Sequence, residues 1–171
     1  GDAHFLKGMP PLLFENLGNG TFRDAGAKGG PLFQTLLNAR GSGVGDFDND
    51  GQLDLVLTTL AGPAALLMNR RATPQHWLAL ALEGARSNRD GFGAQVRVSA
   101  AGRVQYAEAR CPTTYVFQQD TRLHFGLAGQ TRADRIDIRW PSGQTQTLTN
   151  VAADQVLKVR EPGASRWAVV R

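Results

Sequence analysis

The sequence has only one cysteine, Cys111, so it cannot form a disulfide within the chain. It also has no apolar run that approaches the roughly 20 residues of a membrane-spanning helix, so no membrane span is expected. The sequence contains no signal peptide and begins at Gly1 rather than Met, and we expect a mature or truncated product whose targeting segment lies outside the sequence. Because bacterial extracellular proteins often lack disulfides, the single cysteine does not place the chain in the cytosol.

A concentrated basic surface is missing as well. The formal net charge is +4, but the basic side chains are scattered, and only Arg70 and Arg71 are adjacent. Proteins that bind nucleic acids usually gather their positive charge on one face or in one run, so no nucleic-acid partner is expected. The sequence also lacks a nucleophile–base pair, a phosphate-binding loop and a redox motif, and these absences favour a protein that is not an enzyme.

What the sequence has in quantity is glycine and short apolar segments. Among 171 residues, 42% are hydrophobic, 20% are charged and 20 are glycine. This composition suits a packed core interrupted by many turns, and it favours an all-β fold with almost no helix.

Residues 1–75 differ in pattern from the rest of the chain. The segments 12–16 and 21–22 flank an Asn-Gly turn and predict a short hairpin. Residues 31–38 fit either a helical turn or a strand. Further strands are expected at residues 55–59 and 64–69.

From His76 onward, apolar and polar residues alternate with a period of two, as in strands that bury one face. The clearest example is the segment 135–140, where two isoleucines and a tryptophan alternate with charged residues. Turn sequences separate such segments, and the pattern predicts a small antiparallel β-sandwich over residues 76–161. Residues 162–171 are expected to form a C-terminal tail. Other alternating apolar positions are Leu78, Leu80, Leu82, Val96, Val98, Leu157 and Val159.

The one strong chemical signal is an acidic loop with the pattern Asp-x-Asp-x-Asp-Gly-x-x-Asp. Calcium takes six to eight oxygen ligands at about 2.3–2.6 Å, and alternate residues of a tight loop can direct carboxylates toward one ion. Gly51 supplies the positive φ that a sharp bend needs. Phe47 and Leu53 are expected to point outward into the neighbouring core. The ligands predicted for one Ca²⁺ ion are the side chains of Asp46, Asp48, Asp50 and Asp54 and the main-chain carbonyl of Gln52.

The loop differs from an EF-hand, which needs a bidentate glutamate at its twelfth position. That position is Leu57 here, and strands rather than helices are expected on both sides. One alternative is an acidic surface turn without a metal, although four carboxylates this close repel one another without a cation. Another is magnesium, which prefers a smaller octahedral shell and retains several waters.

These segments resemble known families. The loop, with Gly43-Val44-Gly45 before it and Leu55-Val56-Leu57 after it, resembles the FG-GAP/VCBS repeat of integrin-type β-propellers, and residues 14–22 are similar to the NNGDGTF element of that repeat. Residues 77–161 resemble the ASPIC/UnbV domain. This order of repeat and domain is similar to the C-terminal end of cartilage-acidic-protein-like extracellular proteins. The markers of the second resemblance are residues 87–94, 123–127, 140–143 and 150–151.

The resemblance implies one or more partial β-propeller blades over residues 1–75, followed by the β-sandwich. It implies a secreted protein, extracellular or periplasmic, and it carries over the calcium ligands of the loop but no catalytic residue. Because a closed propeller needs about four to eight blades, the chain is expected to be the C-terminal fragment of a longer protein.

The leading functional hypothesis is a non-enzymatic, calcium-binding interaction module. Its expected partners are the missing propeller blades or another protein chain, such as an extracellular or cell-surface protein. The alternative is an accessory or structural subunit of a larger multi-chain assembly.

Several other side chains admit a functional role, but a structural role is favoured for each. His124 has no second histidine or acid at ligand spacing, and Cys111 has no neighbour in the sequence that would activate a thiol. Trp77 and Trp140 could form a sugar-stacking platform, but Trp140 shares the apolar face of its strand. Residues 87–91 could form a second ligand site, and a hydrogen-bonded turn is the simpler interpretation.

Overall fold

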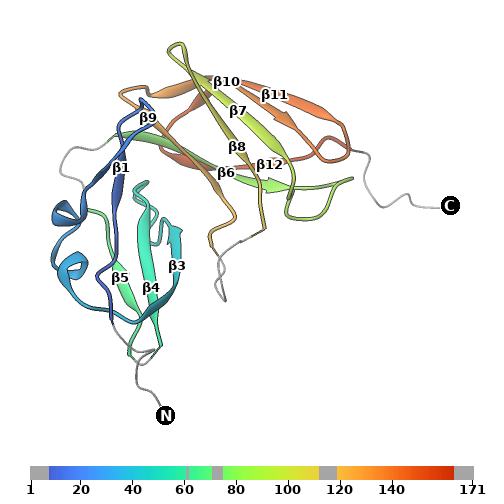
Figure 1. Ribbon diagram of the computed structural model, residues 1–171. Coiled ribbons are helices and arrows are strands. Elements are labelled where there is room, and N and C mark those ends of the chain that lie inside the picture. The colour runs from blue at the N-terminus through green and yellow to red at the C-terminus, as the bar shows by residue number, and fades with distance from the viewer. Residues whose placement is uncertain (1–7, 61, 71–74, 112–118, 164–171) are drawn as a thin grey trace.

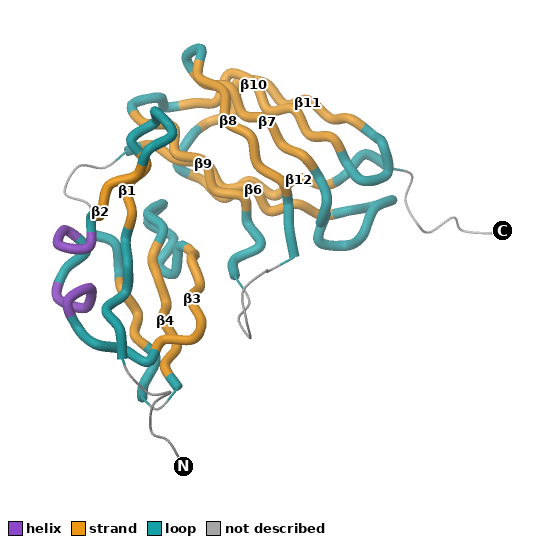
Figure 2. The backbone as a smooth tube through the Cα atoms, viewed as in Figure 1, coloured by secondary structure: helices purple, strands orange, loops and turns teal. Residues whose placement is uncertain are grey.

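The computed structural model describes residues 8–60, 62–70, 75–111 and 119–163, and almost all of its regular structure is β-strand (Figure 1). Residues 8–70, here called the blade unit, precede residues 75–163, here called the sandwich (Figure 2). The predicted fold class, all-β with partial blade structure followed by a sandwich, is confirmed. Most of the predicted tail, residues 162–171, lies outside the described residues. None of the helices found among the described residues is apolar and long enough for a membrane crossing.

The blade unit begins with the predicted hairpin, in which β1 (Phe14–Asn16) pairs antiparallel with β2 (Phe22–Asp24). Two short 3₁₀ helices follow, η2 (Gly26–Lys28) and η3 (Pro31–Gln34). The second helix resolves the ambiguity at residues 31–38, because Pro31 at its first position suits the start of a helical turn.

The remaining strands of the blade unit form an antiparallel sheet in the order β3–β4–β5. The acidic loop is the connection between its first two strands. The bounds of the three strands are β3 (Ala39–Gly45), β4 (Asp54–Thr59) and β5 (Ala65–Leu67).

The blade unit buries little apolar surface of its own. Its buried apolar side chains are Ala25, Phe33 and Leu57, whereas twelve large apolar side chains are exposed. A sheet is stable when its apolar face packs against another layer, so these side chains mark a surface that needs a neighbour. The twelve are Met9, Leu12, Leu13, Phe14, Leu17, Phe22, Leu36, Val44, Phe47, Leu53, Leu60 and Leu66.

The sandwich consists of a four-stranded sheet in the order β11–β10–β7–β8 and a three-stranded sheet in the order β12–β6–β9. The strands of the first sheet are β7 (Gln95–Ala100), β8 (Arg103–Glu108), β10 (Arg132–Arg139) and β11 (Thr145–Ala152). Those of the second are β6 (His76–Glu83), β9 (Leu123–Ala128) and β12 (Gln155–Arg160).

The core of the sandwich lies between the two sheets and follows the alternation in the sequence. Ile136 and Ile138 point inward from β10, and Leu78 and Leu80 point inward from β6, all at most 1% exposed. One pairing departs from the antiparallel pattern that was expected. β12 runs parallel to β6, with Gln155 opposite Leu78, because the chain crosses the other sheet before returning.

Two turns of the sandwich meet at the buried carboxylate of Glu161, which directly follows β12. It accepts hydrogen bonds from the backbone N–H groups of Ala85, Arg86 and Ser87, at 2.8, 2.7 and 2.7 Å, and from the hydroxyls of Ser87 and Ser142. Burial works against the negative charge and raises the pKa of Glu161. The hydrogen bonds from Ser142, Ser87 and Arg86 outweigh burial and lower that pKa to about 2.

Candidate metal centre

The acidic loop curls around the carboxylate of Asp46. This carboxylate accepts hydrogen bonds from the N–H of Asp50 at 3.1 Å and of Gly51 at 2.9 Å. The tight path needs left-handed backbone at two positions, Asn49 with φ 58° and Gly51 with φ 85°. Asparagine and glycine are the residues that adopt this conformation most readily, so the sequence shapes the loop locally.

The loop brings three of the predicted ligands together. Oxygen atoms of Asp46, Asp48 and Asp50 all lie within 4.8 Å of one another. Two oxygens bound to one Ca²⁺ ion can be separated by at most about twice the 2.3–2.6 Å ligand distance, so this spacing is compatible with one shared ion. Asp46 is buried and the other two side chains are exposed. The cluster could therefore hold a metal ion with one side open to solvent.

A cationic side chain already lies against this cluster. The Nη1 atom of Arg70 is 2.6 Å from a carboxylate oxygen of Asp48 and 3.4 Å from one of Asp50. The hydrogen bond from Arg70 lowers the pKa of Asp48. The guanidinium supplies positive charge at the place where a metal would supply it, and its position shows that Asp48 and Asp50 can share one cation.

The structure places the other two predicted ligands differently. Asp54 is 2% exposed, and its two oxygens accept hydrogen bonds from the N–H of Phe47 at 3.0 Å and of Asn69 at 2.8 Å. It closes the base of the loop and ties it to the segment after β5. Gln52 donates to Asp50 through its backbone N–H, at 2.8 Å, and through its side chain, at 3.0 Å. The coordination of an ion by Asp54 or by the carbonyl of Gln52 stays a prediction.

The expectation that Phe47 and Leu53 point into a neighbouring core is wrong for the described residues. Phe47 is 52% exposed and Leu53 is 42% exposed. Alternation had placed them on the side of the loop away from the ion, but the described chain provides no apolar layer to cover that side. Both belong to the exposed apolar set of the blade unit.

The loop is docked against the sandwich (Figure 1). Just before β9, the guanidinium of Arg122 donates to the carbonyl of Asp46 at 2.9 Å and to the side chain of Asn49 at 2.8 Å. Asp120 holds that guanidinium in place through an ion pair of 2.6 Å. Arg122, held by Asp120, therefore ties the loop to the sandwich at two points, the carbonyl of Asp46 and the side chain of Asn49.

A second set of contacts forms around Gly51. Its carbonyl lies 2.9 Å from Nε2 of His124, and a carbonyl only accepts, so this nitrogen carries the proton. The ring of His124 stacks on Trp77 with centroids 5.8 Å apart and an interplanar angle of 7°. A Cβ atom at Gly51 would lie 1.9 Å from Nε1 of Trp77. Glycine is thus needed here both for its positive φ and for the close approach of the indole.

These contacts settle the roles of several other candidate residues. His124 was expected to bond within the sandwich, but its hydrogen bond is to the carbonyl of Gly51 in the acidic loop. Trp140 is 1% exposed in the core and Trp77 is 9% exposed beneath the loop, so they form no exposed platform. Residues 87–91 form a hydrogen-bonded turn in which Asn88 both donates to and accepts from the backbone of Phe92. Cys111 is exposed.

The sequence did not reveal Arg70, Asn69 or Arg122 as neighbours of the loop. Arg70 is separated from Asp48 by 22 positions, and Arg122 from Asp46 by 76. Neither residue belongs to a motif with a fixed spacing from the aspartates. The one local signal was the glycine after Asp50, which marks a place where another group approaches the backbone closely.

Comparison with known proteins defines the class to which these two units correspond. Residues 7–57 match the FG-GAP-like repeat, and residues 84–166 match the family described as ASPIC and UnbV. The resemblance expected from the sequence is therefore confirmed: the chain carries an FG-GAP-like repeat region followed by an ASPIC and UnbV region.

Cartilage acidic proteins are among the relatives that align with most of the chain. The chain is 28% identical over 148 residues to cartilage acidic protein 1 of Homo sapiens, an alignment that covers 78% of this chain and 22% of the relative. The corresponding protein of Xenopus tropicalis is 27% identical over 135 residues, which cover 73% of this chain and 20% of the relative. The chain thus spans about a fifth of the length of these curated relatives.

Proposed function

We propose that this chain is a non-enzymatic interaction module of a secreted protein, extracellular or periplasmic, and that it binds one calcium ion in the acidic loop. The observation that carries the metal proposal is the convergence of three carboxylates within 4.8 Å on a loop of an FG-GAP-like repeat. A cation at this point would offset their mutual repulsion.

The side chains that would hold the ion are Asp46, Asp48 and Asp50. Each carboxylate has about four lone-pair directions, so Asp46 retains acceptor capacity after its two hydrogen bonds to the backbone. The ion would supply concentrated positive charge and oxygen coordination that stiffen the loop. An all-oxygen set of hard ligands suits calcium, and an open set without fixed octahedral geometry suits magnesium less well.

The features of the site favour a weak affinity. Two of its carboxylates are exposed, and the guanidinium of Arg70 already offsets part of their negative charge. Calcium sites of extracellular modules bind at about 10⁻⁴–10⁻³ M, which matches such a site. This supports an extracellular location, in line with the family resemblance.

The interaction proposal rests on the exposed apolar side chains of the blade unit. Among its described residues the blade unit buries only three apolar side chains. It therefore needs another layer to cover its sheets. Its proposed partner is further propeller blades of a longer protein or, alternatively, a separate chain for which this one is an accessory or structural subunit. Ultracentrifugation of this chain with and without the adjoining blades distinguishes the two, since added blades would suppress self-association if they are the natural cover.

The calcium proposal is tested by thermal unfolding in calcium, in magnesium and in chelator. Binding only the folded form at 100 times the dissociation constant stabilises a protein by about 2.7 kcal/mol, so calcium should raise the Tm of the parent chain clearly. Asp50→Ala removes one carboxylate from the loop and should abolish that rise.

The matched control is Asp90→Ala, which removes an exposed carboxylate from the turn at residues 87–91 of the sandwich and should keep the response to calcium. Equal melting of the parent in all three solutions would show that the loop is an acidic turn without a metal.

A further inference from the structure

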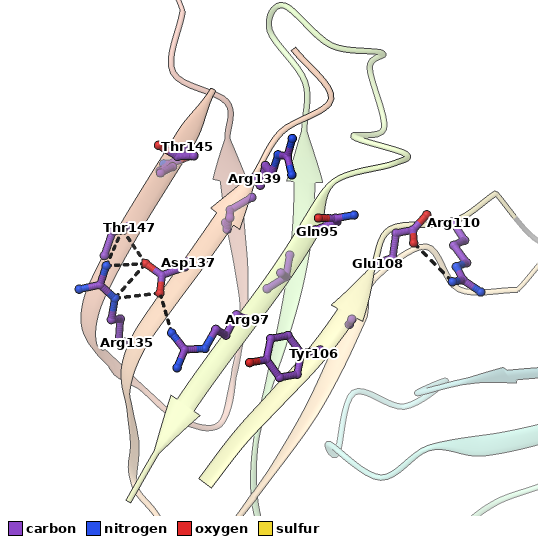
Figure 3. A pocket seen from close by; sticks show the side chains of 14 residues that line it. Gln95, Arg97, Tyr106, Glu108, Arg110, Arg135, Asp137, Arg139, Thr145 and Thr147 are labelled. Carbon is purple, nitrogen blue, oxygen red and sulfur yellow. Dashed lines mark hydrogen bonds and ion pairs between the residues drawn. The ribbon is translucent and has the colours of Figure 1, made fainter. Parts of the chain in front are cut away.

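The outward face of the four-stranded sheet carries a second candidate binding surface. This face is hollowed by about 690 Å³. Figure 3 shows the side chains that line the hollow, which come from β7, β8, β10 and β11. The inward face of the same strands forms the core. The metal loop docks on the outward face of the other sheet, through Trp77 and His124. The hollow and the loop therefore lie on opposite sides of the sandwich.

The sheet register arranges the side chains of the hollow in rows across the strands. In one row Asp137 faces Thr147 on one side and Arg97 on the other, and Arg97 in turn faces Tyr106. In the next row Arg139 lies between Thr145 and Gln95. A single layer of charged, amide, hydroxyl and aromatic groups results, all presented on the same face of a rigid sheet.

Positive charge is in excess on this face. Asp137 is bound by Arg135 at 2.8 Å and by the hydroxyl of Thr147 at 2.7 Å, while Arg97 reaches it only at 3.7 Å. Arg139 makes no ion pair with any other residue that the structure describes, and no dashed line reaches it in Figure 3. One carboxylate thus serves two guanidiniums and leaves a third without a counter-ion.

The two weakly engaged guanidiniums can act together. Arg97 lies opposite Asp137 and Arg139 lies opposite Gln95, so the two arginines are diagonal neighbours on adjacent antiparallel strands. Diagonal positions are about 7–8 Å apart, within reach of long side chains. This is a spacing of strand positions, and in Figure 3 the two guanidiniums point away from each other, so a shared anion requires both side chains to turn toward it. Two guanidiniums that converge in this way can hold one planar or tetrahedral anion through several charge-assisted hydrogen bonds.

An aromatic ring lies beside this pair. Tyr106 is 75% exposed and directly faces Arg97 across β7 and β8 (Figure 3). An exposed ring on a flat sheet offers an apolar face with a polar edge. The apolar face of a sugar ring matches such a surface, because its C–H groups lie on one side and its hydroxyls lie at the rim.

We propose that this face binds an acidic oligosaccharide, with an anionic group held by Arg97 and Arg139 and a sugar ring lying on Tyr106. Sugar hydroxyls both donate and accept, and the hollow offers acceptors on Asp137 and Glu108 as well as donors and the hydroxyls of two threonines. An extended peptide would pair with the sheet edges, β8 and β11, rather than cover the face. The inference is independent of the calcium proposal.

The test is calorimetric titration of the 171-residue chain with a glycosaminoglycan hexasaccharide that carries uronic carboxylates and sulfates. A neutral hexasaccharide and a hexaglutamate peptide are titrated in parallel. Only the acidic hexasaccharide is expected to bind, and added salt should weaken it. Binding should be unchanged by chelator, which separates this result from the outcome at the metal loop.

Two substitutions test the two parts of the site. Arg139→Gln removes the free guanidinium and Tyr106→Ala removes the ring without changing charge, and each should weaken binding about tenfold. The charge-matched control is Arg160→Gln on β12 of the other sheet, which should bind as the parent does. The proposal is overturned if the hexasaccharide does not bind, if hexaglutamate binds as well, or if Arg160→Gln weakens binding as much as Arg139→Gln. It is equally overturned if Tyr106→Ala binds normally. Thermal unfolding of each variant confirms that the fold is retained.

Discussion

At the scale of single residues, the three clustered carboxylates are held in different ways. Asp46 is fixed by two backbone N–H groups, whereas Asp48 and Asp50 lie against the guanidinium of Arg70. A metal ion bound here would compete with this guanidinium for the negative charge of both exposed carboxylates. Arg70 is therefore a competitor for the site, and its removal should favour the ion.

Arg70→Gln is expected to tighten calcium binding. An exposed ion pair contributes little to stability, so loss of this competitor should lower the calcium Kd by only a few-fold. Calorimetric titration with calcium measures the change. Arg40→Gln, an exposed arginine of the same unit that bonds only to the carbonyl of Ala39 among the described residues, controls for the loss of one positive charge. If the Arg70 variant binds calcium no more tightly than the control, the guanidinium does not compete.

The residue spacing predicted this cluster well but not its boundaries. Alternating aspartates on a tight loop converge because successive side chains of such a loop turn inward, and this property is local. The role of Asp54 depends on Asn69, which is distant in the sequence, and its two oxygens are occupied by backbone donors. The exposure of Phe47 and Leu53 likewise depends on which layer covers the loop, and neighbouring residues do not determine that layer.

At the scale of elements, Glu161 joins the turn after β6, the turn after β10 and the end of β12. The turns contribute Ser87 and Ser142, which belong to the two sequence markers at residues 87–94 and 140–143. The structure gives these markers a shared physical purpose, since both supply donors to one carboxylate. Neither marker predicted the other, because the residue that unites them, Glu161, lies 19 positions after Ser142 and 74 positions after Ser87.

The Glu161 carboxylate makes the stability of the sandwich sensitive to acid. Its pKa in the folded chain is about 2, below the ordinary value of 4.5. A depressed carboxyl pKa contributes stability that is complete above the unfolded pKa and is lost as the pH falls through the folded pKa. The contribution should therefore persist at neutral pH and disappear between about pH 5 and pH 2.

Glu161→Gln tests this dependence. The amide keeps one acceptor but directs an NH₂ group at backbone donors, so the variant should be about 3 kcal/mol less stable at neutral pH. The difference in Tm between parent and variant should be largest above pH 5 and should shrink toward pH 2. A difference that stays constant across this range would mean that the ionised carboxylate is not the stabilising group.

The strands themselves were largely predictable, but their pairing was not. Period-two alternation identified β6, β7, β10 and β12, because each buries one face in the core. Alternation reports which residues face inward and carries no information about the neighbouring strand. The parallel alignment of β12 with β6 could therefore not be read from either segment.

At the scale of the whole molecule, the acidic loop is one place where the blade unit contacts the sandwich. Arg122 and His124 bind the loop from the sandwich side, and the three aspartates define its shape from within. An ion that stiffens the loop should also stiffen its contacts with β9. The sequence contained both halves of this interface but no pattern that relates them.

Hydrogen exchange measures this coupling. In the parent chain, calcium should slow amide exchange in the loop and also in β9, and chelator should reverse both effects. In Arg122→Gln the effect of calcium should be confined to the loop and its flanking strands. Arg132→Gln, which removes an arginine of the other sheet that bonds Asn150 and makes no contact with the loop among the described residues, should behave as the parent does. Calcium protection that never extends to β9 in the parent would refute the coupling.

The parallel pairing of β6 with β12 also sets an order of events during synthesis. β6 ends at Glu83, and its partner ends at Arg160, near the end of the described chain. A ribosome extends a chain at about 5–20 residues per second, so the first strand of the sandwich must wait several seconds before its last neighbour exists. During that interval the edge of β6 is open, and the apolar surface of the blade unit has already emerged. The nascent chain is therefore exposed to mispairing until β12 is made, and factors that shield unpaired edges would act during that interval.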